Sequence, residues 1–116
     1  MARKIIKNPY KCPVTHAMNI IGGKWKSIII YLLSKGSLRF GKLAMFIPSI
    51  SRKVLTDQLR EMESDGLVIR EKFKEIPPRV EYSLTESGKA LVPLFLAMAD
   101  WSNEFAEGIV FESLPE

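Results

Sequence analysis

The sequence predicts a mainly α-helical domain that carries one small β-hairpin, an α+β fold. Apolar residues recur with the 3.6-residue period of a helix before Gly66 and again after Thr85. Between these two positions the apolar period changes to two, which is typical of strands. The chain has 116 residues, of which 47% are apolar and 26% charged. This composition suffices for one compact core, so we expect a single domain over residues 1–116.

Three helices are predicted before Pro48. Pro13 suits the first turn of a helix that Gly22-Gly23 ends, because glycine readily adopts the left-handed conformation that closes helices. A second helix begins near Lys24 and ends at Gly36, and a third is short. The apolar faces are Trp25, Ile28, Ile29, Leu32 and Leu33 in the second helix, and Phe40, Leu43, Ala44 and Ile47 in the third.

A fourth helix follows, with Ser49 or Ser51 as its N-cap and Gly66 as its end. Its buried stripe is predicted to be Val54, Leu55, Leu59 and Met62. At 100° per residue, the opposite face carries Lys53, Thr56, Asp57, Arg60 and Ser64. This mostly polar face is expected to point to solvent.

Two strands follow Gly66 and are joined by a loop of four residues, 75–78. This loop would pair Lys74 with Arg79 and would set Lys72 opposite Glu81. The same register places Phe73 opposite Val80 and Ile69 opposite Leu84. Arg70 and Lys72 could then be engaged in ordinary cross-strand ion pairs.

A last helix is predicted from Thr85, its N-cap, to about Glu107, and Pro93 should kink or break it. Beyond Pro93 the apolar residues surround most of the helix, which is more than one small domain can cover. The residues expected to contact a second chain are Leu94, Phe95, Met98, Trp101 and Phe105.

Charge is divided unevenly along the chain. Residues 1–60 hold 12 Lys and Arg against one acid, whereas residues 61–116 hold 5 against 12 acids. The basic half suggests a polyanionic partner, although a solvated basic surface would have the same composition.

The order of helices and hairpin is that of a winged helix-turn-helix with a long C-terminal dimerisation helix. In this motif the second helix of the pair, here residues 51–65, enters the DNA major groove, and the wing, residues 70–83, lies beside it. The sequence also resembles HxlR-type transcriptional regulators, which are bacterial and archaeal winged-helix proteins related to the MarR group. The resemblance rests on CPVTHAMNIIGGKW from Cys12, RFGKLAMFIPSISRKVLTDQLREMESDGLV, PPRVEYSLTESGKAL and the later Asp100-Trp101.

The resemblance implies a homodimer that binds a pseudo-palindromic site on double-stranded DNA, with its dimer built from the N-terminal and C-terminal helices. By motif position, and with Arg60 from the outward helix face, the expected DNA-binding residues are Ser49, Ser51, Arg52, Lys53, Thr56, Arg60 and Arg79. Some family members sense electrophiles or oxidants through a cysteine at the position of Cys12. In this sequence Cys12 follows Lys11 and precedes a helix, a setting that favours thiolate, but burial in the dimer interface would make the thiol inert.

Other classes of function find little support. One His and one Cys cannot form a zinc cluster, and no glycine-rich phosphate loop is present, so we expect no enzyme, metal or cofactor. The longest apolar run, 28–33, is too short to cross a membrane, and no signal peptide is evident, which together predict a cytoplasmic protein. The alternative function is a winged helix that binds another protein without specific DNA binding.

Overall fold

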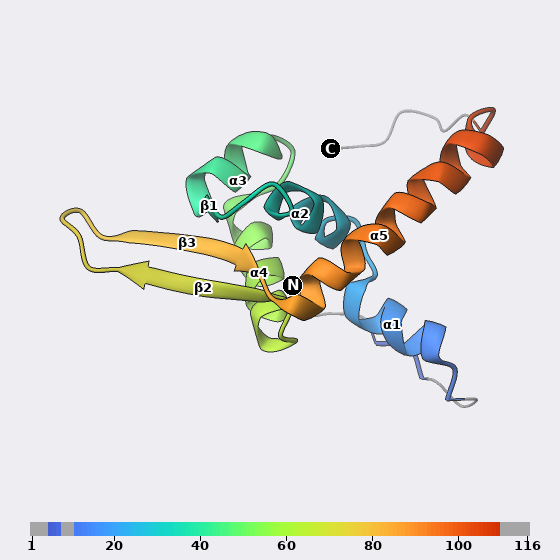
Figure 1. Ribbon diagram of the computed structural model, residues 1–116, viewed down its shortest axis with the longest axis horizontal. Helices are drawn as coiled ribbons and strands as arrows, with labels where there is room; N and C mark the ends of the chain where they lie inside the picture. The colour runs from blue at the N-terminus through green and yellow to red at the C-terminus, as the bar shows by residue number, and fades with distance from the viewer. Residues whose placement is uncertain (1–4, 8–10, 110–116) are drawn as a thin grey trace.

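The computed structural model (Figure 1) describes residues 5–7 and 11–109. Its first half contains α1 (Pro13–Ile21), α2 (Lys26–Leu33), β1 (Leu38–Arg39), α3 (Phe40–Phe46) and α4 (Arg52–Ser64). Its second half contains β2 (Val68–Phe73), β3 (Arg79–Leu84), α5 (Glu86–Trp101) and a π-helical turn, η1 (Ser102–Ala106). The predicted α+β winged helix-turn-helix is confirmed. Residues 1–4 and 8–10 of the basic half and residues 110–116 lie outside the described part of the predicted domain.

Two side-chain caps fix the helices on either side of the hairpin. The Ser51 hydroxyl accepts a hydrogen bond from Val54 N–H at 3.1 Å. Of the two predicted N-caps of α4, Ser51 and not Ser49 is therefore the one observed. The Thr85 hydroxyl likewise accepts from Gly88 N–H at 3.1 Å and starts α5 as predicted.

The predicted register of the hairpin is wrong by one residue. Phe73 pairs with Arg79, so the loop has five residues, 74–78, and Val68 rather than Ile69 lies opposite Leu84. A shift of one residue exchanges the two faces of a strand, and Val68 is accordingly buried while Ile69 is exposed. The expected pair of Lys72 with Glu81 does not form, because Lys72 lies opposite Val80.

The sheet has a third strand that was not predicted. The two-residue β1 pairs antiparallel with β3, Leu38 opposite Tyr82, and gives the strand order β1-β3-β2. So short a strand leaves no periodic pattern in the sequence. Its effect is to tie the start of α3 to the hairpin.

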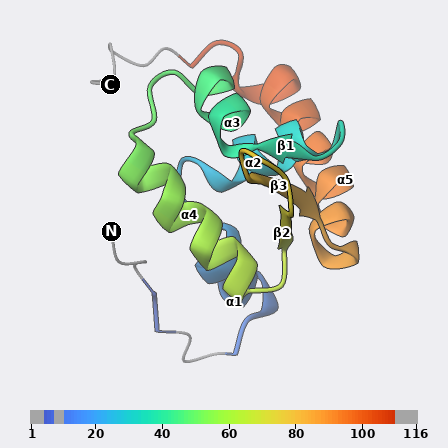
Figure 2. The same ribbon diagram turned by 90° about the vertical axis from the view of Figure 1, so that its left-hand side faces the viewer.

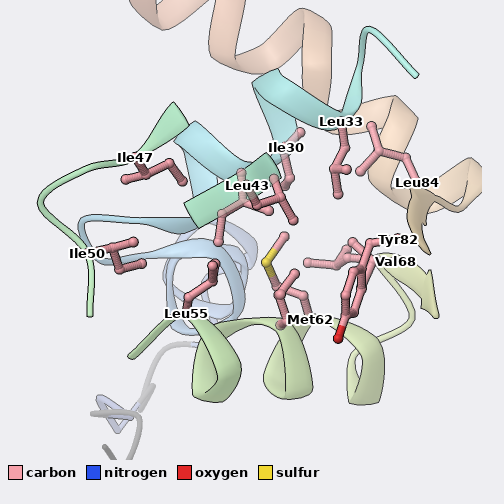
Figure 3. Packing of buried hydrophobic residues seen from close by; sticks show 13 residues of the cluster. Ile30, Leu33, Leu43, Ile47, Ile50, Leu55, Met62, Val68, Tyr82 and Leu84 are labelled. Atoms are coloured by element: carbon pink, nitrogen blue, oxygen red, sulfur yellow. The ribbon is translucent and has the colours of Figure 1, made fainter. Parts of the chain in front are cut away.

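The core lies between α2, α3, α4 and the base of the sheet (Figure 3). The buried face of α4 consists of Leu55, Leu59 and Met62 as predicted, with Val54 half-buried at its edge. The buried face of α2 differs from the prediction, because Ile30 is buried and Ile28 is exposed. An all-apolar run such as residues 28–33 does not reveal by its pattern which side faces inward.

Helix α5 continues through Pro93 to Trp101, so the predicted break is absent. The helix is attached to the core at its start, where Gly88 is buried and a Cβ at this position would collide with the carbonyl oxygen of Leu67. Leu91, Val92 and Phe95 also pack against the core, and the part of α5 beyond them extends away from the body of the molecule (Figure 1). None of the helices described here has the length and apolarity needed to cross a membrane.

Candidate nucleic-acid interface

Helix α4 and the hairpin are exposed on one side of the molecule. In Figure 2 the tip of the hairpin points toward the viewer and α4 lies beside it, in front of α1. A helix and an adjacent projecting hairpin are the two elements with which a winged helix-turn-helix contacts neighbouring grooves of DNA.

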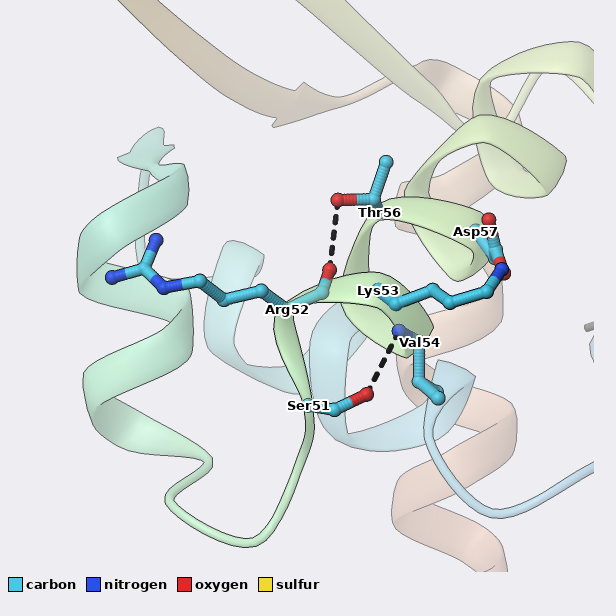
Figure 4. A network of polar contacts seen from close by, with 6 residues as sticks. All are labelled: Ser51, Arg52, Lys53, Val54, Thr56 and Asp57. Carbon is cyan, nitrogen blue, oxygen red and sulfur yellow. Dashed lines mark hydrogen bonds and ion pairs between the residues drawn. The ribbon is translucent and has the colours of Figure 1, made fainter.

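The first turn of α4 presents two cations in different directions (Figure 4). The Arg52 side chain extends toward α3, where its guanidinium carbon lies 5.8 Å from the centre of the Phe40 ring. The Lys53 ammonium lies 3.1 Å from Asp57 Oδ2, an exposed ion pair of the kind that holds its partners only weakly. Both cations can therefore turn to a phosphate or a base edge.

The hydroxyl groups of this turn are mostly engaged within the helix. Ser51 caps the helix, and Thr56 Oγ1 donates to the Arg52 carbonyl at 2.8 Å. Ser49 and Arg60 are exposed and lie on either side of this turn along the chain. The structure thus brings six of the seven predicted DNA-binding residues to α4 and the turn before it.

Arg79, the seventh, is held on the hairpin. Its Nη2 lies 2.9 Å from Glu75 Oε2, and its Nε lies 3.2 Å from Glu81 Oε2, a charge contact without the alignment of a hydrogen bond. The guanidinium carbon is 4.0 Å from the centre of the Phe73 ring. The Arg79 side chain, which was expected to contact DNA, is thus in contact with two carboxylates and an aromatic ring of its own hairpin.

Two other cations of the hairpin lie on the face of β2 that carries the buried Val68. Val68 is buried against α4, and Arg70 and Lys72 follow it at intervals of two, so they extend the same face of β2. Both are exposed, and neither has an ion-pair partner in the part of the chain that the structure describes. Sequence reasoning left open that they form cross-strand ion pairs, because the predicted register, wrong by one residue, set Lys72 opposite Glu81.

A buried ion pair, which the sequence did not reveal, connects α4 to the rest of the domain. Lys26 is 2% exposed, and its ammonium donates to Glu61 Oε1 of α4 at 2.7 Å and to the carbonyl oxygen of Ile20 in α1 at 3.1 Å. The pair lines a half-open cavity of about 820 Å³ between α1 and α4, whose walls include Val14 and Trp25. Lys26 and Glu61 are 35 residues apart in the sequence, so no local sequence pattern links them.

Cys12 is the N-cap of α1 and is half-buried. The backbone N–H of Thr15, its hydroxyl and the N–H of Val14 act together to lower the pKa of the Cys12 thiol, with burial opposing them. The direction agrees with the prediction, and of the two causes proposed from the sequence, the start of the helix acts on the thiol whereas Lys11 does not. No cluster of metal-ligating side chains occurs among the residues that can be described.

The predicted dimer residues are largely uncovered. Leu94, Met98, Trp101 and Phe105 are more than half exposed, whereas Phe95 packs partly against the core. The Trp101 and Phe105 rings lie 6.1 Å apart at one end of this apolar stripe. Helix α1 also contains no buried residue and exposes Val14 and Met18.

Comparison with known proteins identifies the family. Residues 20–109 match the family described as HxlR-like helix-turn-helix. The chain is 48% identical over 98 residues to the HTH-type transcriptional regulator YdeP of Bacillus subtilis. The aligned residues cover 84% of this chain and 77% of YdeP. It is also 48% identical over 96 residues to an HTH-type transcriptional regulator of Methanothermobacter thermautotrophicus, with 83% and 73% covered.

Solved structures agree with this match. The redox regulator HypR in its reduced form superposes with a TM-score of 0.78 at 45% identity, covering 83% of this chain and 95% of HypR. The reduced transcriptional regulator YodB from B. subtilis has a TM-score of 0.75 at 38% identity, with 83% and 95% covered. These relatives are regulators rather than enzymes. The chain therefore belongs to the HxlR-like helix-turn-helix family of DNA-binding transcriptional regulators.

Proposed function

We propose that this regulator is a homodimer that binds a pseudo-palindromic DNA site through α4 and the hairpin. The observation that carries the proposal is the position of Arg52 and Lys53 on the exposed first turn of α4, on the side to which the hairpin projects. Arg70 and Lys72 extend this positive surface along the hairpin. Such a surface fits a DNA duplex, which presents phosphates on both sides of each groove.

Each residue has a proposed role. Arg52 and Lys53 contact base edges or phosphates in the major groove, and Arg60 contacts the backbone. The exposed Ser49 donates to a phosphate oxygen, and Thr56 does so by exchanging its hydrogen bond to the Arg52 carbonyl for one to the DNA, while Ser51 acts by starting the helix whose positive end faces the DNA. Arg79 shapes the hairpin through its ion pairs with Glu75 and Glu81.

Dimerisation is supported by the apolar stripe of α5 and by the lack of buried residues in α1. Packing these helices against a second copy would cover Leu94, Met98, Trp101 and Phe105. A two-fold dimer would hold the two α4 helices about 34–36 Å apart or a multiple of it, which matches a pseudo-palindromic site. Sedimentation analysis should show a dimer at micromolar concentration, and a stable monomer there would contradict the proposal.

The DNA-binding proposal is tested by recovering genomic fragments with the purified protein and titrating the selected duplex by fluorescence anisotropy. Arg52→Ala and Lys53→Ala should each weaken binding by about 1–3 kcal/mol if they contact bases. The matched control is Lys89→Ala, which removes an exposed cation from α5. Affinity should also fall steeply with salt. Unchanged binding in both α4 variants would refute the assignment, and affinity independent of salt would favour a protein partner.

Cys12 is proposed to make DNA binding responsive to an electrophile or oxidant. Its lowered pKa increases the fraction of thiolate, the form that reacts with both. Among the similar structures, HypR is a redox regulator, and YodB has been solved both with quinone bound and after diamide treatment. The test is a gel shift with and without diamide or a quinone, on wild type and Cys12→Ser. If wild-type binding does not change and mass spectrometry finds no adduct at Cys12, the thiol is structural.

A further inference from the structure

Lys26, the first residue of α2, joins three helices from a buried position. Its ammonium donates to the carbonyl oxygen of Ile20 in α1 at 3.1 Å and to Glu61 Oε1 in α4 at 2.7 Å, and the side chain is only 2% exposed. Away from water both hydrogen bonds are stronger than they would be at the surface. The ammonium therefore fixes the end of α1 against the second half of α4.

Apart from its last residues, α1 does not pack into the core of its own protomer. Ile20 and Ile21 are partly buried against the core, whereas Val14 and Met18 are exposed and no residue of α1 is fully buried. Val14, Met18 and Lys26 all line the cavity of about 820 Å³ between α1 and α4. Because side chains of α1 and α4 do not fill this space, the orientation of one helix relative to the other depends strongly on the bonds of Lys26.

Stability alone does not account for a buried ion pair at this place. Moving an ammonium and a carboxylate out of water costs free energy that their attraction repays only in part, and apolar side chains of similar volume often stabilise a fold equally well. An ion pair differs from apolar packing in being directional. It is satisfied only when donor and acceptor meet at short range, so it selects one arrangement of the helices that it joins.

The arrangement of α1 and α4 matters because α4 carries the residues proposed to bind DNA, and α1 is proposed to pack against the second copy. Arg52 precedes Glu61 on α4 by about 13 Å along the helix axis, at 1.5 Å per residue. A rotation of α4 by about 10° about Glu61 would move Arg52 by about 2 Å, enough to lose a hydrogen bond to a base. A small change at Lys26 is thus enlarged at the DNA.

We propose that Lys26 is a positioning residue for DNA recognition, which ties α1 to α4 and thereby sets the spacing of the two half-sites that the dimer accepts. This inference rests on the proposed function and extends it to a residue that does not touch DNA. The two α4 helices of a dimer must match their half-sites both in separation and in angle around the duplex. With Lys26 in place α4 moves together with the dimer helix α1, and without it α4 can adapt to other spacings.

The test compares wild type with the double variant Lys26→Met with Glu61→Gln on the genomic duplex recovered above, and on duplexes with one base pair inserted or removed between the half-sites. One base pair changes the separation by about 3.4 Å and the angle by about 34°. We expect wild type to bind the altered duplexes at least about tenfold more weakly, because protein or DNA must be strained. The double variant should bind the original duplex about three- to tenfold more weakly, since its α4 helices are less preorganised, and should lose less than about threefold on the altered duplexes.

A control and a second variant separate positioning from a general loss of stability. Ile29→Val shortens a fully buried side chain of α2 and destabilises the domain mildly, but it leaves the bonds of Lys26 in place and should discriminate between spacings as wild type does. Lys26→Met alone also breaks both hydrogen bonds and should relax the discrimination as the double variant does. Circular dichroism and sedimentation are expected to show the wild-type fold and dimer for all three proteins.

The outcomes separate this inference from the proposed function. If wild type prefers one spacing and both Lys26 variants keep that preference in full, Lys26 does not position α4 and the proposed function stands. The inference is also wrong if Ile29→Val relaxes the preference as much as they do, because spacing would then follow stability. If wild type prefers no genomic duplex, or binds all spacings equally, the pseudo-palindromic dimer and this inference are both wrong.

Discussion

The buried pair of Lys26 and Glu61 makes a sharp prediction about stability. Lys26 has almost no contact with water, whereas the Glu61 side chain retains 17% of its exposure. Removing the acid by Glu61→Ala would leave the ammonium with the Ile20 carbonyl, at 3.1 Å, as its hydrogen-bond partner among the described residues. An uncompensated buried charge of this kind costs about 3–5 kcal/mol, a large part of the stability of a small domain.

Removing the lysine should have a smaller effect. Lys26→Met keeps most of the side-chain volume and deletes the charge, and Glu61 can turn toward water, so we expect a loss of about 1–2 kcal/mol. The double variant Lys26→Met with Glu61→Gln has no buried charge at this site. Its stability should lie within about 1 kcal/mol of wild type and above that of Glu61→Ala.

Urea unfolding followed by circular dichroism measures these differences. All variants are compared at one protomer concentration, because the stability of a dimer depends on it. The reasoning is refuted if Glu61→Ala loses less than about 1 kcal/mol, or if Lys26→Met is the more damaging single change. Either result would mean that water or another group reaches the ammonium.

Three further predictions concern other parts of the fold. Trp101→Ala should weaken the dimer by several kcal/mol, of order 3–5, in sedimentation equilibrium, and an unchanged dimer would exclude this end of α5 from the interface. Thr15→Val removes the hydroxyl that helps to lower the pKa of Cys12, so the pKa should rise and the thiolate fraction at neutral pH should fall. Alkylation of the variant by iodoacetamide should then be slower than that of wild type at pH 7, and the two rates should converge at high pH. Gly88→Ala places a methyl group against the Leu67 carbonyl and should destabilise the fold by about 1–3 kcal/mol in thermal unfolding, whereas an unaltered melting temperature would show that α5 can shift.

The order of helices could be predicted because each carried its own local signal. Pro13, Ser51 and Thr85 mark helix starts that the structure confirms, and the buried stripe of α4 follows from its spacing. The hairpin register could not be predicted with the same certainty, because Val68 and Ile69 are adjacent apolar residues and either could face inward. The loop length decides between them, and its five residues leave Val68 inside.

The candidate site was predictable where it depends on one helix and not where it depends on packing. Lys53 is exposed on α4 as its periodicity requires, and Arg52, which was expected at the DNA by motif position, is exposed as well. Arg79 was expected at the DNA because its sequence position lies on the wing, but its ion pairs depend on the register and on the folding back of Glu75. The burial of Lys26 depends on a partner 35 residues away, which no single-helix pattern can show.

The junction between α4 and α5 has a consequence for how such regulators diversify. Thr85 donates its N–H to the Leu67 carbonyl at 3.0 Å and its hydroxyl to the Gly66 carbonyl at 2.6 Å, so the chain closes on itself where the hairpin begins and ends. The two ends of the hairpin are thus held together at its base. Residues can be exchanged, added or removed in pairs at its tip without moving either helix. Selection can alter the wing while the α4 frame and the helix offered for dimerisation stay constant. Within one architecture, preference for DNA shape and preference for base sequence can then evolve separately.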